Sequence, residues 1–149
     1  MLKQRIEQDL KTAMLGGDKQ TVATLRGLKS VILYAEVAKG VRDEGLGDEE
    51  ITALLVKEAK KRQESADLYS KGGSTDRAED ELAEKTIIEE YLPKQLSDDE
   101  LRKTIEVVVN SESQPSMQNI GQIIGKVKQE TKGAADGARI AQFVKERLN

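Results

Sequence analysis

The stretch YLPKQLSDDE, residues 91–100, marks the point where the chain passes from one group of predicted helices to another. Proline fixes its own φ angle and disfavours helical geometry in the residue before it, so a helix cannot easily continue through Leu92 and Pro93. Just downstream, Ser97 and Glu100 have the spacing of a capping box, in which each side chain bonds the backbone amide of the other residue. The stretch therefore predicts a corner where one helix ends and another begins.

Upstream of this corner, apolar residues recur at helical spacing and glycines separate the segments. Leu2, Ile6 and Leu10 share one face of the first segment, and the pair Gly16-Gly17 stops it. Asp48 is the predicted N-cap of the third helix, because acidic residues are favoured at a helix N-terminus. The pattern predicts four helices, over residues 2–15, 19–39, 48–71 and 76–92.

Downstream of the corner, a shorter segment carries three further helical patterns. In the first, Leu101, Ile105 and Val108 are predicted to face inward. The second carries Met117, Ile120, Ile124 and Val127 at helical spacing, and the third carries Ile140, Ala141, Val144 and Leu148. Gly133 suits a left-handed helix C-cap, and Asp136 suits the N-cap of the last helix. The sequence thus predicts an all-α fold, with a helical N-terminal domain of about four helices (residues 1–94) and a small three-helix C-terminal domain (residues 95–149).

The composition argues against the commonest catalytic chemistry. With no histidine and no cysteine, the usual general base, zinc ligands and thiolate nucleophile are missing. There is also no Walker-type loop and no GxGxxG turn, so we predict no catalytic residue, no metal site and no cofactor. Catalysis by Asp, Glu, Lys or Ser stays open. No apolar run is long enough to span a bilayer and no signal-peptide pattern opens the chain, which predicts a cytoplasmic protein without membrane contact.

Charge is unevenly distributed along the chain. Residues 79–106 hold ten acidic and four basic residues, whereas residues 126–149 hold six basic and three acidic ones. The formal net charge of −3 does not suit a stand-alone nucleic-acid binder, but a basic end can still meet phosphate locally. Two other interpretations stay open: a solvated helix face, and an acidic surface at residues 79–106 that binds another protein. The six basic residues are Lys126, Lys128, Lys132, Arg139, Lys145 and Arg147.

The densest basic stretch is KEAKKRQESADLY, residues 57–69. On a helical projection Glu58 and Arg62 fall inside the apolar arc at i, i+4 spacing, with Lys60 and Lys61 between them in sequence. The simpler interpretation is a partly buried ion pair that fixes the register of the helix. The alternative is an arginine held rigidly to receive a phosphate or carboxylate. The pattern favours the ion pair.

Two glycines, Gly121 and Gly125, lie one turn apart inside a predicted helix. Each costs roughly 1 kcal/mol of helix stability relative to alanine. Such a pair suggests that another backbone approaches closely, either from within the molecule or from a ligand.

Several short motifs, in their order and spacing, resemble the YqeY family over essentially the whole chain. They are DLKTAM (residues 9–14), LR (25–26), DEEI (48–51), KKRQES (60–65), YLPKQLS (91–97), IG (120–121) and KGAADG (132–137). Members of this family are free-standing relatives of the tail domain of the B subunit (GatB) of the tRNA-dependent amidotransferase.

The resemblance implies a non-catalytic accessory module that binds tRNA or another structured RNA. It associates the chain with glutamine-dependent carbon–nitrogen ligation, and with amidotransferase-like subunits or another protein as partners, although nothing in the sequence resembles a glutaminase or ATP site. Two positions where the family is usually basic carry Ser74 and Ala134. Combined with the basic C-terminal segment, the resemblance predicts an RNA-contacting set of Lys126, Lys128, Lys132, Gly133, Asp136, Gly137 and Arg139.

Overall fold

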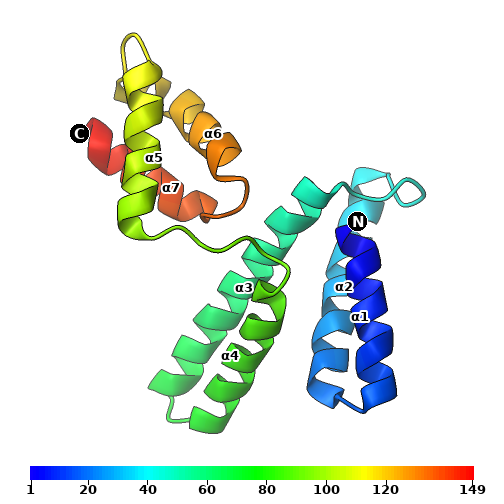
Figure 1. Cartoon of the computed structure of the whole chain (residues 1–149). Helices are drawn as coiled ribbons and strands as arrows, with labels where there is room; N and C mark the ends of the chain where they lie inside the picture. Colours follow the sequence, from blue (N-terminus) through cyan, green and yellow to red (C-terminus); the bar gives the residue numbers. More distant parts are fainter. The chain divides into compact units, whose positions relative to one another are not determined.

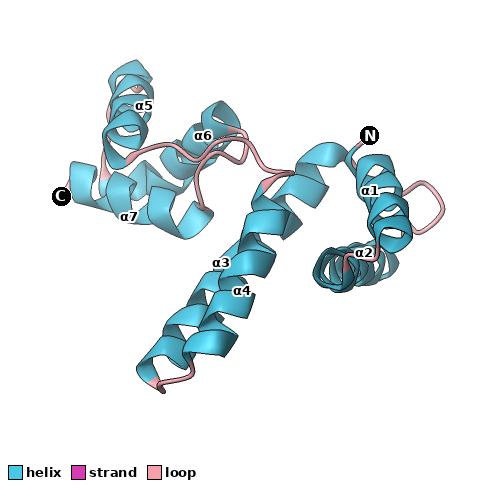
Figure 2. Cartoon of the chain, turned by 60° about the horizontal axis from the view of Figure 1, so that its bottom comes forward, coloured by secondary structure: helices cyan, strands magenta, loops and turns pink.

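The computed structural model describes residues 1–149 and contains helices and loops but no strand, as Figure 2 shows. The predicted all-α fold is confirmed. The chain forms two compact units, Met1–Leu92 and Pro93–Asn149, and each has a hydrophobic core of its own. No helix is long and apolar enough to cross a membrane.

The N-terminal unit consists of two helical hairpins (Figure 1). Its helices are α1 (Leu2–Gly16), α2 (Lys19–Lys39), α3 (Asp48–Lys71) and α4 (Thr75–Glu89). Helix α1 packs against α2 and α3 packs against α4, while side chains from all four helices meet in one core. The buried members of this core are Ile6, Leu10, Leu25, Leu28, Ile32, Ile51, Leu55, Ala59, Ile88 and Tyr91.

Glycines mark the helix ends in this unit, and one predicted helix cap is wrong. Helices α1 and α2 end at Gly17 and Gly40, whose φ angles of 72° and 75° lie in the left-handed region that glycine adopts without strain. The N-cap of α3 is Gly47, so the prediction that Asp48 caps this helix is wrong. Asp48 is instead the first helical residue, and its carboxylate accepts hydrogen bonds from the backbone N–H of Leu2 and from the N-terminal amine.

A buried carboxylate holds the start of α1 against α2 and the following loop. Glu36 is only 1% exposed, and its oxygens accept hydrogen bonds from Lys3 Nζ at 3.0 and 3.1 Å and from the backbone N–H of Leu46 at 2.9 Å. The hydrogen bond from Lys3 is the main reason that the pKa of Glu36 lies below its ordinary value, against the opposing effect of burial.

The end of the N-terminal unit is tied to α1 through an aromatic side chain. The hydroxyl of Tyr91 donates to Asp9 Oδ2 at 2.5 Å, and the guanidinium of Arg5 lies 4.7 Å from the centre of the ring. Burial and the neighbouring Asp9 raise the pKa of Tyr91 above its ordinary value, so the hydroxyl stays protonated as a donor. Helix α4 ends at Glu89, a little earlier than the sequence predicts.

The C-terminal unit is a three-helix arrangement with a short 3₁₀ turn (Figure 1). Its helices are α5 (Asp98–Ser111), α6 (Ile120–Thr131) and α7 (Gly137–Leu148), and the 3₁₀ turn η1 (Met117–Asn119) precedes α6. The capping box of Ser97 and Glu100 opens α5 as predicted. On α6 the buried residues are Ile123, Val127 and Thr131, whereas Met117 lies in η1 before this helix and is 40% exposed, so the predicted helix does not include it. The buried core contains Leu101, Ile105, Val108, Val109, Ile123, Val127, Ala135, Ile140, Phe143 and Val144.

The first residues of this unit are fastened to the turn between α6 and α7. The backbone N–H of Leu96 donates to the carbonyl of Ala134 at 2.8 Å, and the side-chain amide of Gln95 donates to the carbonyl of Gly133 at 3.1 Å. Arg139 donates from Nη1 to the carbonyl of Leu96 at 2.8 Å. The segment after Pro93 therefore pairs with KGAADG, the motif that the sequence singles out at the α6–α7 turn.

Candidate nucleic-acid interface

The α6–α7 turn begins with two consecutive residues of positive φ. Lys132 is the C-cap of α6 with φ 47°, and Gly133 follows with φ 86°. The prediction that Gly133 is the C-cap is therefore displaced by one residue, although Gly133 does need the left-handed region that the sequence assigned to it. Lys132 ends the helix with an exposed side chain.

The turn ends at the predicted N-cap of α7. The carboxylate of Asp136 accepts a hydrogen bond from the backbone N–H of Ala138 at 3.3 Å, so this prediction is confirmed. At Gly137, a Cβ atom would meet Lys128 Cε at 3.2 Å and Lys128 Nζ at 3.4 Å. The absence of a side chain at Gly137 therefore lets Lys128 extend across the first turn of α7. The two alanines of the motif, Ala134 and Ala135, are buried.

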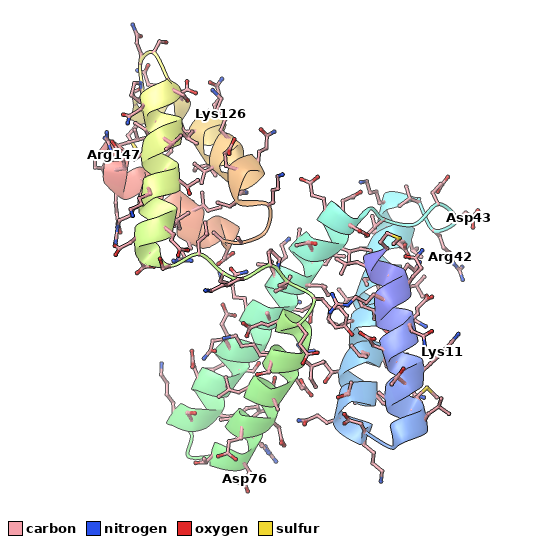
Figure 3. The ribbon with its side chains drawn as sticks, in the orientation of Figure 1. Lys11, Arg42, Asp43, Asp76, Lys126 and Arg147 are labelled. Carbon is pink, nitrogen blue, oxygen red and sulfur yellow. The ribbon has the colours of Figure 1, made fainter.

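Three of the six basic residues near the C-terminus form ion pairs within the unit. Lys126 pairs with Glu112 at the end of α5, and Arg147 Nε and Nη2 bond the carboxylate of Glu106 at 2.6 and 2.9 Å. Figure 3 shows Lys126 on α6 and Arg147 on α7, on either side of α5. The hydrogen bond from Arg147 is the main reason that the pKa of Glu106 lies below its ordinary value.

Arg139 has a structural position in this unit. Besides its bond to the carbonyl of Leu96, its Nη2 atom lies 2.6 Å from Asp98 Oδ1, and its guanidinium lies 5.6 Å from the ring centre of Phe143. Its side chain is about one quarter exposed, at 27%. These contacts hold the start of α5 against α7, a role that the sequence analysis missed because the partners lie far away in sequence.

The other three basic residues, Lys128, Lys132 and Lys145, are exposed and have no acidic side chain within ion-pair distance. Glu130 lies between the first two in sequence, but at about 100° per residue it is about 200° around the helix from Lys128. Lys128 and Lys132 are one turn apart at the end of α6. They therefore place two positive charges at the α6–α7 turn, neither of which forms an ion pair with a carboxylate.

The same side of α6 carries the two glycines. Gly121, Gly125 and Lys128 follow one another at i, i+4 and i+7, and Lys132 comes next at the helix end. Both glycines are exposed, and a Cβ atom at either would meet nothing within 4 Å. Packing within the C-terminal unit therefore does not account for these glycines. The surface of Gly121, Gly125, Lys128 and Lys132 is called the α6 face below.

The basic cluster on α3 has a different environment. Glu58 is only 6% exposed, and Arg62 Nη1 lies 3.2 Å from its Oε2 atom. Arg62 Nε also donates to Glu84 Oε2 on α4 at 2.8 Å, with Glu81 at 3.9 Å. Glu58 also accepts a hydrogen bond from Lys61 at 3.2 Å. The partly buried ion pair favoured by the sequence is present, and the cross-helix partners on α4 were not foreseen.

The remaining member of that cluster, Lys60, is exposed and also engaged in an interaction of its own. The carboxylates around Arg62 lie close enough together to change one another's pKa values. Burial, followed by repulsion from Glu84, raises the pKa of Glu81 above its ordinary value. The α3 cluster thus links two helices, and its arginine is already occupied by carboxylates.

Comparison with known proteins agrees with the motifs. The profile of the family described as Yqey-like protein matches residues 3–148. The chain is also similar to a protein of Kluyveromyces lactis named Altered inheritance of mitochondria protein 41, mitochondrial. The two are 29% identical over 130 residues, which cover 85% of this chain and 69% of the relative. Since the family profile spans nearly the whole sequence, the chain belongs to the Yqey-like protein family.

Proposed function

We propose that the protein is a non-catalytic accessory module that binds tRNA or another structured RNA through the α6 face of its C-terminal unit. The observation that carries the proposal is the pair of exposed lysines without an ion pair, Lys128 and Lys132, beside a helix surface without side chains at Gly121 and Gly125. Such a surface would let a sugar–phosphate backbone approach the helix closely and place phosphates against the two lysines.

Structured RNA suits this surface better than a single strand. Single-stranded nucleic acid is usually held by stacking on exposed aromatic rings. The only aromatic residue of the C-terminal unit is Phe143, which is buried with Arg102 over its ring at 4.7 Å. A-form RNA is recognised mainly by shape and by contacts to phosphates and 2′-hydroxyls, which need no stacking. By family association, such a module would act next to amidotransferase-like subunits that supply the chemistry of carbon–nitrogen ligation.

The predicted RNA-contacting set divides into residues that are proposed to contact phosphate or shape the turn and residues that make structural contacts within the unit. Lys128 and Lys132 are the proposed phosphate contacts, with Gly133 and Gly137 shaping the turn around them. Lys126, Asp136 and Arg139 hold the unit together, and Arg139 is thus a poor choice for a binding variant. The cytoplasmic location stays a prediction, and the name of the Kluyveromyces lactis relative contains the word mitochondrial.

The test is a titration of tRNA at several salt concentrations, with the wild type and a Lys128→Gln/Lys132→Gln variant. A protein that binds through phosphates loses affinity steeply as salt rises, and each lost contact lowers the slope of log affinity against log salt by about 1. The double variant is therefore expected to bind roughly tenfold more weakly at low salt, with a slope lower by about 2.

The matched control is Lys57→Gln/Lys71→Gln, which changes the net charge equally but replaces two exposed lysines of α3. This control is expected to retain wild-type affinity and slope. Equal losses in both double variants would indicate attraction by net charge alone and contradict an interface on the α6 face. Salt-insensitive binding would contradict phosphate contact altogether.

The acidic segment 79–106 has less support as a protein-binding surface. Glu81 and Glu84 face Arg62, Glu106 pairs with Arg147, and Asp98 pairs with Arg139, so these charges are used inside the two units. Partners that persist in a pull-down after nuclease treatment, and that the Lys128→Gln/Lys132→Gln variant retains, would favour this alternative.

A further inference from the structure

A groove runs between α1 and α2, which lie side by side in the N-terminal unit (Figure 1). Its volume of about 530 Å³ is within the range of sites that bind ligands or peptide side chains. The buried core residues Ile6, Leu10 and Ile32 lie beneath its floor, and Leu33 is the exposed apolar side chain that lines it. No residue of α3 or α4 lines it, so both of its walls come from the first helical hairpin.

The two walls of the groove differ in charge. The α2 wall carries Arg26 and Lys29, which are exposed and have no acidic side chain within ion-pair distance. The α1 wall carries Glu7 and Lys3, and Lys3 is already paired with the buried Glu36. Since that carboxylate is satisfied by Lys3 and by the loop backbone, the free positive charge of the groove lies on α2.

Next to these cations, α2 exposes a cluster of large apolar side chains. Leu33, which lines the groove, is 43% exposed, and its neighbours Tyr34 and Val37 are 76% and 55% exposed. Arg26, Leu33 and Val37 lie at i, i+7 and i+11, so they form one stripe of about 16 Å along the helix. Apolar side chains gathered on one exposed face, and bordered by charge, are typical of interaction surfaces.

We propose that this groove binds an amphipathic helix of a partner protein, with the apolar stripe of that helix in the groove and a row of carboxylates facing α2. A groove between two helices accepts a third helix through apolar side chains at i, i+3, i+4 and i+7. Arg26 and Lys29 select an acidic flank on the side of α2, because opposite charges at the rim of an interface favour the correct partner and orientation. This surface lies in the N-terminal unit and is independent of the proposed RNA contact.

The test uses the full chain and a labelled synthetic helical peptide that has a leucine stripe flanked on one side by glutamates. Fluorescence anisotropy measures its affinity and that of a second peptide in which lysines replace the glutamates. The wild type is expected to bind the glutamate peptide at least about tenfold more tightly than the lysine peptide. The Arg26→Glu/Lys29→Glu variant is expected to reverse this preference, and Leu33→Asp to abolish binding of both peptides.

The matched control is Arg42→Glu/Lys57→Glu, which replaces one exposed arginine and one exposed lysine outside the groove; Figure 3 labels Arg42 on the loop between α2 and α3. It is expected to keep the preference for the glutamate peptide. Because Arg26, Lys29 and Leu33 are exposed, circular dichroism should show the wild-type helix content for every variant.

Three outcomes would overturn the proposal. The first is equal affinity for the two peptides, or an unchanged preference in Arg26→Glu/Lys29→Glu. The second is a wild-type dimer in sedimentation that Leu33→Asp converts to a monomer, since the groove would then be occupied by a second copy of the chain. The third is binding of decanoate at the groove with displacement by neither peptide, which would indicate a site for small apolar anions.

Discussion

Two basic segments of similar sequence character have opposite environments in this molecule. On α3, Arg62 lies among Glu58, Glu81 and Glu84, so its positive charge is shared between carboxylates of two helices. At the end of α6, Lys128 and Lys132 are exposed and form no ion pair. The denser of the two segments in sequence is thus the one whose central cation is already engaged.

The difference shows that the density of charge along a sequence does not reveal which charges are available for a ligand. Availability depends on what the next helix contributes. Glu84 reaches Arg62 from 22 residues away, across the α3–α4 hairpin. On α5, by contrast, Asp98 and Glu106 pair with Arg139 and Arg147 of α7, and no acid of that helix pairs with Lys128.

The largest effect is expected from Arg62→Met. This change leaves Glu58 buried with Lys61 as its remaining cation and removes the link to α4. Breaking one partner of a buried ion pair costs about 3 kcal/mol of unfolding free energy. All three tyrosines of the chain, at positions 34, 69 and 91, lie in the N-terminal unit. Urea unfolding followed by tyrosine fluorescence therefore measures this loss directly.

The comparison requires a matched change in the other segment. Lys128→Met also replaces a basic residue by methionine, but at an exposed position, and is expected to change the unfolding free energy by no more than about 0.5 kcal/mol. In the Glu58→Gln/Arg62→Met double variant no buried charge is left unpaired, so part of the stability should return. Similar losses in Arg62→Met and Lys128→Met would remove the distinction between the two segments.

Much of the fold could be predicted from the sequence because its signals are local. The capping box at Ser97 and Glu100, the N-cap at Asp136 and the glycine at Gly17 act within one turn, and the structure contains all three. The misplaced caps, Asp48 and Gly133, were wrong by one residue each. A side chain that can cap a helix can equally well begin it, and Lys132 adopts the left-handed conformation that the sequence reserved for glycine.

The candidate site was less predictable because it depends on contacts between helices. The roles of Arg139, Lys126 and Arg147 follow from partners on α5 or next to its two ends. These partners are distant in sequence, and only the structure separates the three residues from Lys128 and Lys132. The sequence also could not show that the space around Gly121 and Gly125 is empty, so it left both internal packing and ligand approach open. Met117 was assigned to the same helix as Ile120, Ile124 and Val127 because its spacing fits, but it lies in a 3₁₀ turn before that helix.

The next effect in size concerns the two glycines of the α6 face. Alanine at an exposed helix interior position stabilises the helix by about 1 kcal/mol relative to glycine, and a Cβ atom at Gly121 or Gly125 meets open space. Gly125 lies inside α6 whereas Gly121 is only its second residue, so the double change to alanine is expected to raise the stability of the C-terminal unit by about 1 to 2 kcal/mol. Thermal unfolding followed by circular dichroism should show the gain, while tyrosine fluorescence should show no change in the N-terminal unit.

The same variant sharpens the comparison, because the proposed RNA contact predicts the opposite sign for binding. If a sugar–phosphate backbone approaches these glycines, two added methyl groups should weaken tRNA binding although the protein becomes more stable. Unchanged binding would mean that the α6 face is not the surface of closest approach. A loss of stability would mean that the glycines serve the fold after all.

The smallest effect is expected at Glu81, whose carboxylate lies farther from Arg62 than those of Glu58 and Glu84 do. Burial and the repulsion from Glu84 raise its pKa in the folded protein, so the folded state takes up a proton at a higher pH than the unfolded chain does. Ionised Glu81 therefore lowers the stability of the N-terminal unit at neutral pH, and this cost disappears as the pH falls through the raised pKa. Glu81→Gln should stabilise the unit at pH 7 by no more than about 0.5 kcal/mol, since the variant also loses the weak contact at 3.9 Å with Arg62. Urea unfolding of both proteins across the acidic range should show the difference shrinking as the pH is lowered. If the stability of Glu81→Gln relative to the wild type increased as the pH was lowered, the folded protein would stabilise Glu81 as a carboxylate. Arg62 would then still attract a further negative charge, as the exposed Lys128 and Lys132 are expected to do.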